Sequence, residues 1–319
     1  MDSPGYVELA RSGELRRRID RALEHLRDCR LCPRECGVDR HAGQLGYCGA
    51  GARARVYSHT PHPGEEPPIS GARGSGTIFF SHCTLSCRYC QNFRFSQLHE
   101  GRECSTDELA AMMIELASLG CHNLNVVTGT QFVPVVLDAL GKAARAGVSI
   151  PLVWNTSSYE SRGTVELLDG VADIYLADLR YYSSEAASAH SDAPDYPTVS
   201  RKALLEMQRQ VGTLVVDEDG VAERGLIVRH LVLPDDASGT RAALRFVAEA
   251  LGRSTYVSLM SQYYPAHLAP GDPVLGRRIT RAEWEGAVTA LDEAGLANGW
   301  IQEYPEGLSP IAGTELAPD

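Results

Sequence analysis

The sequence predicts an α/β fold in which six short strands alternate with helices and form an open, partial (β/α)6 barrel. Of its 319 residues, 44% are hydrophobic, which is enough for one large core. Short apolar runs that read as buried strands occur at 77–81, 124–128, 152–155, 174–177, 226–233 and 256–260. Helical patterns separate them at 106–119, 131–146, 161–169, 198–211 and 240–251. This alternation is typical of parallel βαβ units with right-handed crossovers.

The segments on either side of these units differ in character. Apolar residues at helical spacing predict one helix over 6–28, and a last helix is expected near 280–295. Residues 29–75 lack periodicity and are rich in Gly, Pro, Cys and His, as in a metal-stapled or loop-rich segment. We therefore expect an N-terminal helix and cysteine-rich segment (1–75), a barrel core (76–270) and a C-terminal helix and tail (271–319).

The bulk composition limits the class of protein. A net charge of −11 argues against a nucleic-acid or anionic-membrane binder, since these need a basic face. The sequence shows no apolar run that could span a membrane and no signal-peptide core, so a cytoplasmic enzyme is expected. Seven of the nine cysteines fall between Cys29 and Cys90. In a cytosolic chain this clustering favours metal ligation over disulfides.

Three cysteines directly follow the first predicted strand. Cys83, Cys87 and Cys90 are spaced by four and three residues, on a loop at the C-terminal end of a strand, where barrels build their sites. A structural zinc site usually has four protein ligands. A [4Fe–4S] cluster held by three thiolates leaves one iron open for a substrate or cofactor. The alternatives are packed free thiols or part of a zinc site.

This triplet, with Tyr89 beside its last cysteine, resembles the signature of the radical S-adenosylmethionine (SAM) superfamily. The resemblance implies a radical SAM barrel whose [4Fe–4S] cluster binds SAM, with Tyr89 near the adenine. It also implies reductive cleavage of SAM to a 5′-deoxyadenosyl radical, with a flavodoxin or ferredoxin as reductant.

Residues from about 6 to 296 are also similar to the uncharacterised relatives of pyruvate formate-lyase activating enzyme. The matching segments include CRLCPRECGVDRHAGQLGYCGAG, GEEPPISGARGSGTIFFSHC, GCHNLNVVTGT, VADIYLADLRYY, APDYP and GLIVRHLVLP. This likeness implies the radical machinery and leaves the substrate open.

The same resemblance implies further site residues at the ends of later strands. The turn at 128–130 stands where many radical SAM enzymes carry Gly-Gly-Glu, and its alternative role is a simple strand-to-helix turn. Arg180 matches a lysine of the activating enzyme and is suited to clamp a carboxylate, unless it forms an exposed salt bridge. Asn155 replaces an acid, which puts a monovalent-cation site in doubt. The expected SAM-binding residues are Tyr89, Thr128, Gly129, Thr130, Asn155, Ser157, Asp178, Arg229 and Gln262, with Arg180 assigned as catalytic.

The roles of four residues on or directly after the later strands remain open. Arg229 and His230 point to opposite faces of one strand, so only one can face the barrel interior. A buried Arg229 would need a carboxylate partner, and His230 has an alternative role as a core histidine. Ser261 and Tyr264 stand where relatives carry Asp and Arg. That departure indicates either a different substrate or a neutral exchange of one salt bridge for two hydroxyls.

A second cysteine group precedes the barrel. Cys29, Cys32, Cys36 and Cys48 form a four-thiolate pattern that suits either structural Zn²⁺ or a second Fe–S cluster. After it, His59, His62, Glu65 and Glu66 either line the site or lie on a surface loop, and we favour the surface loop.

The sequence therefore favours a radical SAM enzyme that abstracts hydrogen from a small molecule such as a sugar, nucleoside or amino-acid derivative. The outcome would be a decarboxylation, an epimerisation or another rearrangement. One alternative is an activating enzyme that makes a glycyl radical in a partner protein. Another is a non-catalytic Fe–S or zinc protein.

Overall fold

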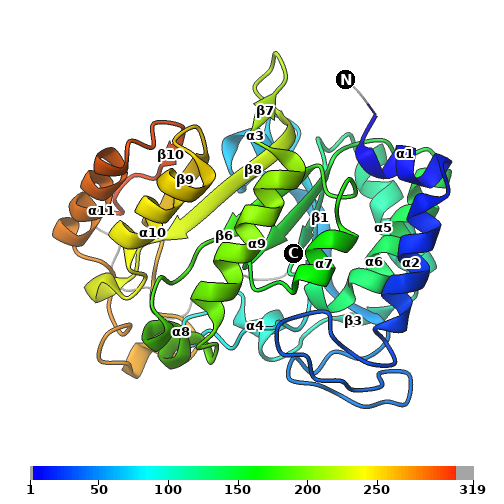
Figure 1. The fold of residues 1–319 in the computed structure, drawn as a ribbon, viewed down its shortest axis with the longest axis horizontal. Helices are drawn as coiled ribbons and strands as arrows, with labels where there is room; N and C mark the ends of the chain where they lie inside the picture. The colour runs from blue at the N-terminus through cyan, green and yellow to red at the C-terminus, as the bar shows by residue number, and fades with distance from the viewer. Residues whose placement is uncertain (1–2, 307–319) are drawn as a thin grey trace.

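The structure is a computed structural model that describes residues 3–306 (Figure 1). Of the predicted C-terminal tail, 307–319 lie outside the described residues. One large sheet runs through the described part, with helices packed along it. Its strands are β1 (Ala54–His62), β2 (Ser75–Phe80), β3 (Arg102–Cys104), β4 (Leu124–Val127), β5 (Leu152–Thr156), β6 (Ile174–Asp178), β7 (Val215–Val216), β8 (Ala222–Leu231), β9 (Tyr256–Met260) and β10 (Gly299–Ile301).

Six parallel strands form the centre of the sheet, in the order β9-β8-β6-β5-β4-β2. They are the six strands that the sequence predicts. Each strand lies beside the one that follows it among the six, with helical segments in the connections, so the open, partial (β/α)6 arrangement is confirmed. The predicted and observed bounds differ most for β8. This strand is predicted over 226–233 but begins at Ala222, because its first residues pair with β7.

Additional strands extend both edges of this core. β10 pairs in parallel with β9, whereas β1 and β3 continue the β2 edge in antiparallel fashion. Sequence analysis missed β1, whose sequence ARVYSHTPH carries polar side chains and a proline. β3 covers only Ala54–Val56, so the rest of β1 is an edge, where proline and polar residues are tolerated. The N-terminal segment thus contributes a strand to the sheet.

The predicted helix over 6–28 is wrong in one respect. The chain forms two helices there, because Gly13 takes a left-handed conformation (φ 77°) between them, and the second ends at Glu24. The other predicted helices are present. The helices are α1 (Gly5–Arg11), α2 (Glu14–Glu24), α3 (Pro67–Ser70), α4 (Phe93–Ser96), α5 (Thr106–Ser118), α6 (Val133–Arg145), α7 (Arg162–Leu167), α8 (Ser184–Ser191), α9 (Tyr196–Val211), α10 (Thr240–Phe246) and α11 (Arg281–Ala294).

The two faces of the parallel strands bury different clusters. Trp154, Tyr175 and Val228 belong to the main core under the helices. Their neighbours in sequence point the other way, because side chains alternate along a strand. Val153, Ile174, Leu176 and Ile227 pack with Ile69 of α3 on the inner face. Figure 1 places α3 at the end of the sheet opposite α4 and α8, so α3 closes the barrel at the N-terminal ends of its strands.

Candidate active site

The cysteine-triplet loop (residues 81–92) follows β2 directly and is supported by hydrogen bonds to its sulfurs. The Leu85 amide lies 3.4 Å from Cys83 Sγ, and the Ser191 hydroxyl lies 3.0 Å from Cys87 Sγ. The Ser96 hydroxyl lies 3.1 Å from Cys90 Sγ. Donors of this kind stabilise thiolates that ligate iron. Sequence reasoning missed both serines, because no motif marks them.

The three thiols lie close enough together to influence one another electrostatically. Burial first, and then the charge of Cys87, raise the pKa of Cys83 to about 12 and that of Cys90 to about 11. Across residues 3–306, no three His, Cys, Asp or Glu side chains are placed to hold a metal ion. A [4Fe–4S] cluster makes a different demand, since each thiolate binds its own iron and the sulfurs need not meet at one ion. The close, donor-supported triplet fits such a cluster.

Tyr89 is buried beside the triplet among aromatic rings. It accepts a 2.8 Å hydrogen bond from the Tyr181 hydroxyl, and its ring meets that of Tyr263 edge-on at 5.7 Å. Tyr181 in turn lies 2.7 Å from Ser191, the residue that contacts Cys87. The aromatic cluster therefore connects Tyr89 with a cysteine of the triplet.

Arg180 extends from the end of β6 toward the triplet. Burial by itself would lower its pKa, but the nearby charges of Asp178 and Cys87 keep the pKa raised and the side chain cationic. One Arg180 nitrogen, Nη2, donates to Asp178 at 2.5 Å. Its buried Nε has no hydrogen-bond partner among the described residues. This donor is therefore free for a carboxylate, in keeping with the predicted role.

Arg229 faces the barrel interior, and His230 does not. Arg229 Nε donates to Asp178 at 2.7 Å, and Nη2 donates to Asn155 at 2.7 Å. His230 is a satisfied core residue, bonded to the Leu179 carbonyl at 2.7 Å and to Thr240 at 3.0 Å. The structure thus supplies the carboxylate partner that a buried Arg229 needs.

Two further carboxylates reach Arg229 from the segment before α3. Glu65 Oε2 lies 3.4 Å and Glu66 Oε2 lies 3.9 Å from Arg229 Nη1. Their side chains are each only 8% exposed, so the favoured surface-loop interpretation is wrong for both glutamates. Burial raises the pKa of Glu65 and of Glu66, and Arg229 opposes that rise. We call the following set the inner polar cluster: Glu65, Glu66, Asn125, Asn155, Asp178 and Arg229.

The two histidines of the same segment remain outside this cluster. His59 pairs with Glu115 at 3.0 Å, and the ring of His62 packs edge-on against Phe79. Of the four residues of this segment, only the two glutamates therefore line the site, which was the alternative interpretation.

The turn at 128–130 is shaped by tight packing. Thr128 has a left-handed φ of 58°, and a Cβ on Gly129 would lie 2.3 Å from Val126 Cγ1. The Thr130 hydroxyl donates to buried Glu160 at 2.8 Å. The Thr128 hydroxyl makes no hydrogen bond to another described residue and is the more available of the two for SAM.

Three other predicted positions lie around the same end of the barrel. Ser157 lies beside Tyr196, whose hydroxyl donates to the Ser157 carbonyl at 2.8 Å. The Gln262 carbonyl accepts from Gln91 at 3.1 Å, so Gln262 meets the triplet loop next to Cys90. Ser261 instead donates to the Glu303 carbonyl at 2.6 Å.

Tyr264 lies under the Arg278 guanidinium, with 5.6 Å between the arginine Cζ and the ring centroid. Together with the contact of Ser261 to Glu303, this gives both departures from the relatives local structural partners. These contacts agree with the neutral-exchange interpretation.

The four-cysteine segment (residues 29–48) is organised by a buried arginine. Arg40 Nη2 lies 3.0 Å from Cys29 Sγ and 3.9 Å from Cys48 Sγ, and the Tyr47 amide lies 3.3 Å from Cys36 Sγ. Burial raises the pKa of Cys32 to about 12, and the other three thiols add to the rise. Cys29 and Cys48 therefore share a donor and all four thiols lie within electrostatic reach of one another, while metal binding here, by zinc or by a cluster, stays a prediction.

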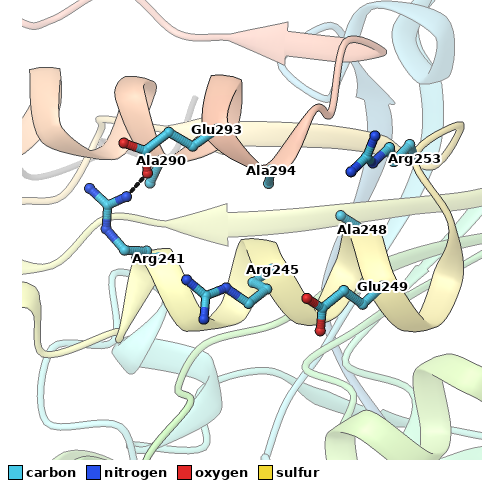
Figure 2. Close-up of a pocket in the computed structure, with 8 residues that line it drawn as sticks. All are labelled: Arg241, Arg245, Ala248, Glu249, Arg253, Ala290, Glu293 and Ala294. Atoms are coloured by element: carbon cyan, nitrogen blue, oxygen red, sulfur yellow. Dashed lines mark ion pairs between the residues drawn. The ribbon is translucent and has the colours of Figure 1, made fainter.

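A pocket of about 250 Å³ lies between α10 and α11, on the outer helices (Figure 2). Figure 2 shows its three arginines, of which Arg241 pairs with Glu293. Another pocket, of about 690 Å³, lies between α7 and α9. Neither pocket contains a residue of the triplet. As for membranes, no helix within 3–306 combines the length and apolar character that a bilayer crossing requires.

Comparisons with known proteins add relatives of limited similarity. No protein-family description matches the chain. The chain is 27% identical over 297 residues to the uncharacterized protein MJ0674 of Methanocaldococcus jannaschii, covering 91% of this chain and 82% of that protein.

Two solved structures are also similar. One is a domain of pyruvate-formate lyase-activating enzyme from Bacteroides vulgatus (15% identity, TM-score 0.38, 54% of this chain and 91% of that one). The other is HydG, a maturase of the [FeFe]-hydrogenase (14% identity, TM-score 0.44, 69% and 49%). Both scores are below 0.5, so the fold assignment rests on the strand order and register of this chain.

Proposed function

We propose that this chain is a radical SAM enzyme that acts on a small molecule such as a sugar, nucleoside or amino-acid derivative. The observation that carries the proposal is the donor-supported cysteine triplet after β2, with the cationic Arg180 directly beside it. When bound, a [4Fe–4S] cluster and SAM supply a 5′-deoxyadenosyl radical that abstracts a hydrogen atom. Reduction would come from a flavodoxin or ferredoxin.

The residues of the site divide into two parts. The cysteines would hold the cluster, and Arg180, with its free Nε, would donate to the SAM carboxylate. Tyr89 and Thr128 would lie against the rest of SAM. The inner polar cluster lies beyond Arg180, joined to it through Asp178. Polar groups placed deep inside a barrel are expected to orient a substrate.

A small substrate is favoured over a protein loop by how the barrel is filled. α3 closes one end of the barrel with Ile69, and Glu65 and Glu66 occupy its middle. At the other end, the four-cysteine segment meets the triplet loop, where Arg34 donates to the Thr84 carbonyl at 3.2 Å. Both features restrict the space for a peptide.

The experiment is a measurement of 5′-deoxyadenosine formed by anaerobically reconstituted protein with SAM and dithionite. Wild type should form it, while Cys83→Ala, Cys87→Ala and Cys90→Ala should each lose it together with the cluster absorbance. Cys121→Ala, a buried cysteine outside both groups, is the matched control and should retain both. Product formation by any triplet variant would overturn the assignment. Absence of product from fully iron-loaded wild type would support the non-catalytic alternative.

A further inference from the structure

We propose that the inner polar cluster is the substrate-recognition site and that it selects a small molecule carrying a basic amino group. This inference rests on the proposed function, because it assigns the substrate class of the same site. It is carried by the charge balance around Arg229 and by two buried acceptor atoms that lack donors.

The charge balance is negative. Asp178, Glu65 and Glu66 all lie against Arg229, at 2.7, 3.4 and 3.9 Å. Arg180 adds a second cation at Asp178. With every group ionised, three carboxylates face two guanidinium groups, which leaves one negative charge in a buried place, and burial raises the pKa of Glu65 and Glu66 against that charge. A buried charge is costly without a partner, so a cationic ligand would complete the set.

The buried side-chain atoms of the inner polar cluster that lack a hydrogen-bond partner among the described residues are all acceptors. Glu66 Oε2 and Asn125 Oδ1 are buried and have no hydrogen-bond partner among the described residues. Both atoms are acceptors. The Asn125 side chain is fixed by its own amide, which donates to Glu65 Oε1 at 3.0 Å. A ligand with N–H donors would satisfy both acceptors, whereas a carboxylate or phosphate would add a further acceptor.

Position divides this site from the one proposed for SAM. The unpartnered donor, Arg180 Nε, lies on the side of the cysteine triplet, and the unpartnered acceptors lie on the side of α3. Asp178 connects the two sides through its contacts with both arginines. The arrangement suits an anionic group of SAM at one end and a cationic group of the substrate at the other.

The test uses anaerobic, cluster-reconstituted wild-type protein with SAM and matched probe molecules. The cationic probes are 1,4-diaminobutane and ethanolamine, and their neutral counterparts are 1,4-butanediol and ethylene glycol at equal ionic strength. Binding is measured as the concentration-dependent shift of the unfolding temperature. We expect the amines, and not the diols, to raise it. In Glu66→Gln the apparent affinity for the amines should fall roughly tenfold or more, since a charged hydrogen bond is lost.

Glu249→Gln is the matched control, because Glu249 is an exposed glutamate of the outer pocket in Figure 2. It should bind the amines as wild type does. Equal shifts from amines and diols, or amine binding that Glu66→Gln leaves intact, would overturn the inference. Should Glu66→Gln fail to fold, the comparison of amines with diols on wild type still decides. Formation of 5′-deoxyadenosine without probe is measured in parallel, so a failure of the radical assignment is seen separately.

Discussion

Arg229 and His230 are adjacent residues that a single step along β8 places in different environments. Arg229 faces three carboxylates on the inner face, and His230 is bonded to Leu179 and Thr240 on the other. Strand alternation predicts that they separate, but it does not say which one faces inward. The partners decide that, because a buried guanidinium needs carboxylates and a neutral imidazole needs one donor and one acceptor.

Replacing Arg229 by methionine should destabilise the protein by about 3–5 kcal/mol, because it leaves buried carboxylates without their cation. Chemical denaturation measures the loss. Arg162→Met removes an exposed ion pair with Glu166 and is the control, with an expected change within about 1 kcal/mol. Equal losses in the two variants would contradict the buried network.

The penalty of Arg229→Met should also depend on pH. Burial raises the pKa of Glu65 and Glu66, and in the wild type Arg229 opposes that rise. A group whose pKa is raised on folding stabilises the fold fully at low pH and loses that contribution as pH rises through the folded pKa. Without Arg229, the largest opposing influence is lost, and for Glu65 only the hydrogen bonds from Asn125 and Asn155 still oppose the rise. Denaturation at pH 5 should therefore show a smaller difference from wild type than at pH 8.

Ser191 is a residue of the candidate site that no sequence motif marks. Its hydroxyl lies 3.0 Å from Cys87 Sγ, although 104 residues separate the two in sequence. Loss of a hydrogen bond to a cluster sulfur disfavours the reduced state, so Ser191→Ala should make the reduction potential more negative, on the order of tens of millivolts. An EPR-monitored titration measures it. Ser200→Ala removes a buried hydroxyl without a hydrogen-bond partner in the described part and should leave the potential unchanged.

At the level of elements, the sequence predicts what local patterns determine. The six core strands are continuous apolar runs, and α5 begins at Ser105 with a capping box that includes Glu108. β1 is not predicted from the sequence, because its own sequence is polar and its pairing with β2 depends on contacts that are distant in sequence. The break between α1 and α2 at Gly13 is not predicted either, because the apolar periodicity continues across it. In the site, the motifs indicate the triplet and Arg180, whereas Glu65 and Glu66 acquire their role only when α3 closes the barrel.

The break between α1 and α2 gives a prediction at this scale. Gly13→Ala should destabilise the protein by about 1 kcal/mol, since φ is 77° there and an L side chain is strained in that conformation. Gly286→Ala lies in the exposed middle of α11 with open space around it, and it should stabilise by about 0.5–1 kcal/mol. Urea denaturation of both variants compares them. A stabilised Gly13→Ala would mean that α1 and α2 can join.

Across the whole molecule, the four-cysteine segment and the triplet loop form one unit. The Cys48 carbonyl lies 2.9 Å from the His82 ring, next to Cys83, and the Tyr47 hydroxyl lies 2.9 Å from Ser86. These contacts join parts of the chain that no periodicity connects. The two thiol groups are therefore expected to influence each other even if only one takes part in the chemistry.

The double variant Cys29→Ser with Cys36→Ser tests this dependence. It should lose the metal of the four-cysteine segment, because two remaining thiols cannot hold a structural zinc ion or a cluster. The triplet should keep its iron, and formation of 5′-deoxyadenosine should fall without vanishing, since loosening the segment disturbs His82 and Ser86 but removes no ligand of the triplet. Elemental analysis and product assays measure the two effects, with Cys121→Ser as control. Unchanged metal content would show that the four thiols bind none, while complete loss of product from folded protein would show that the two groups act together.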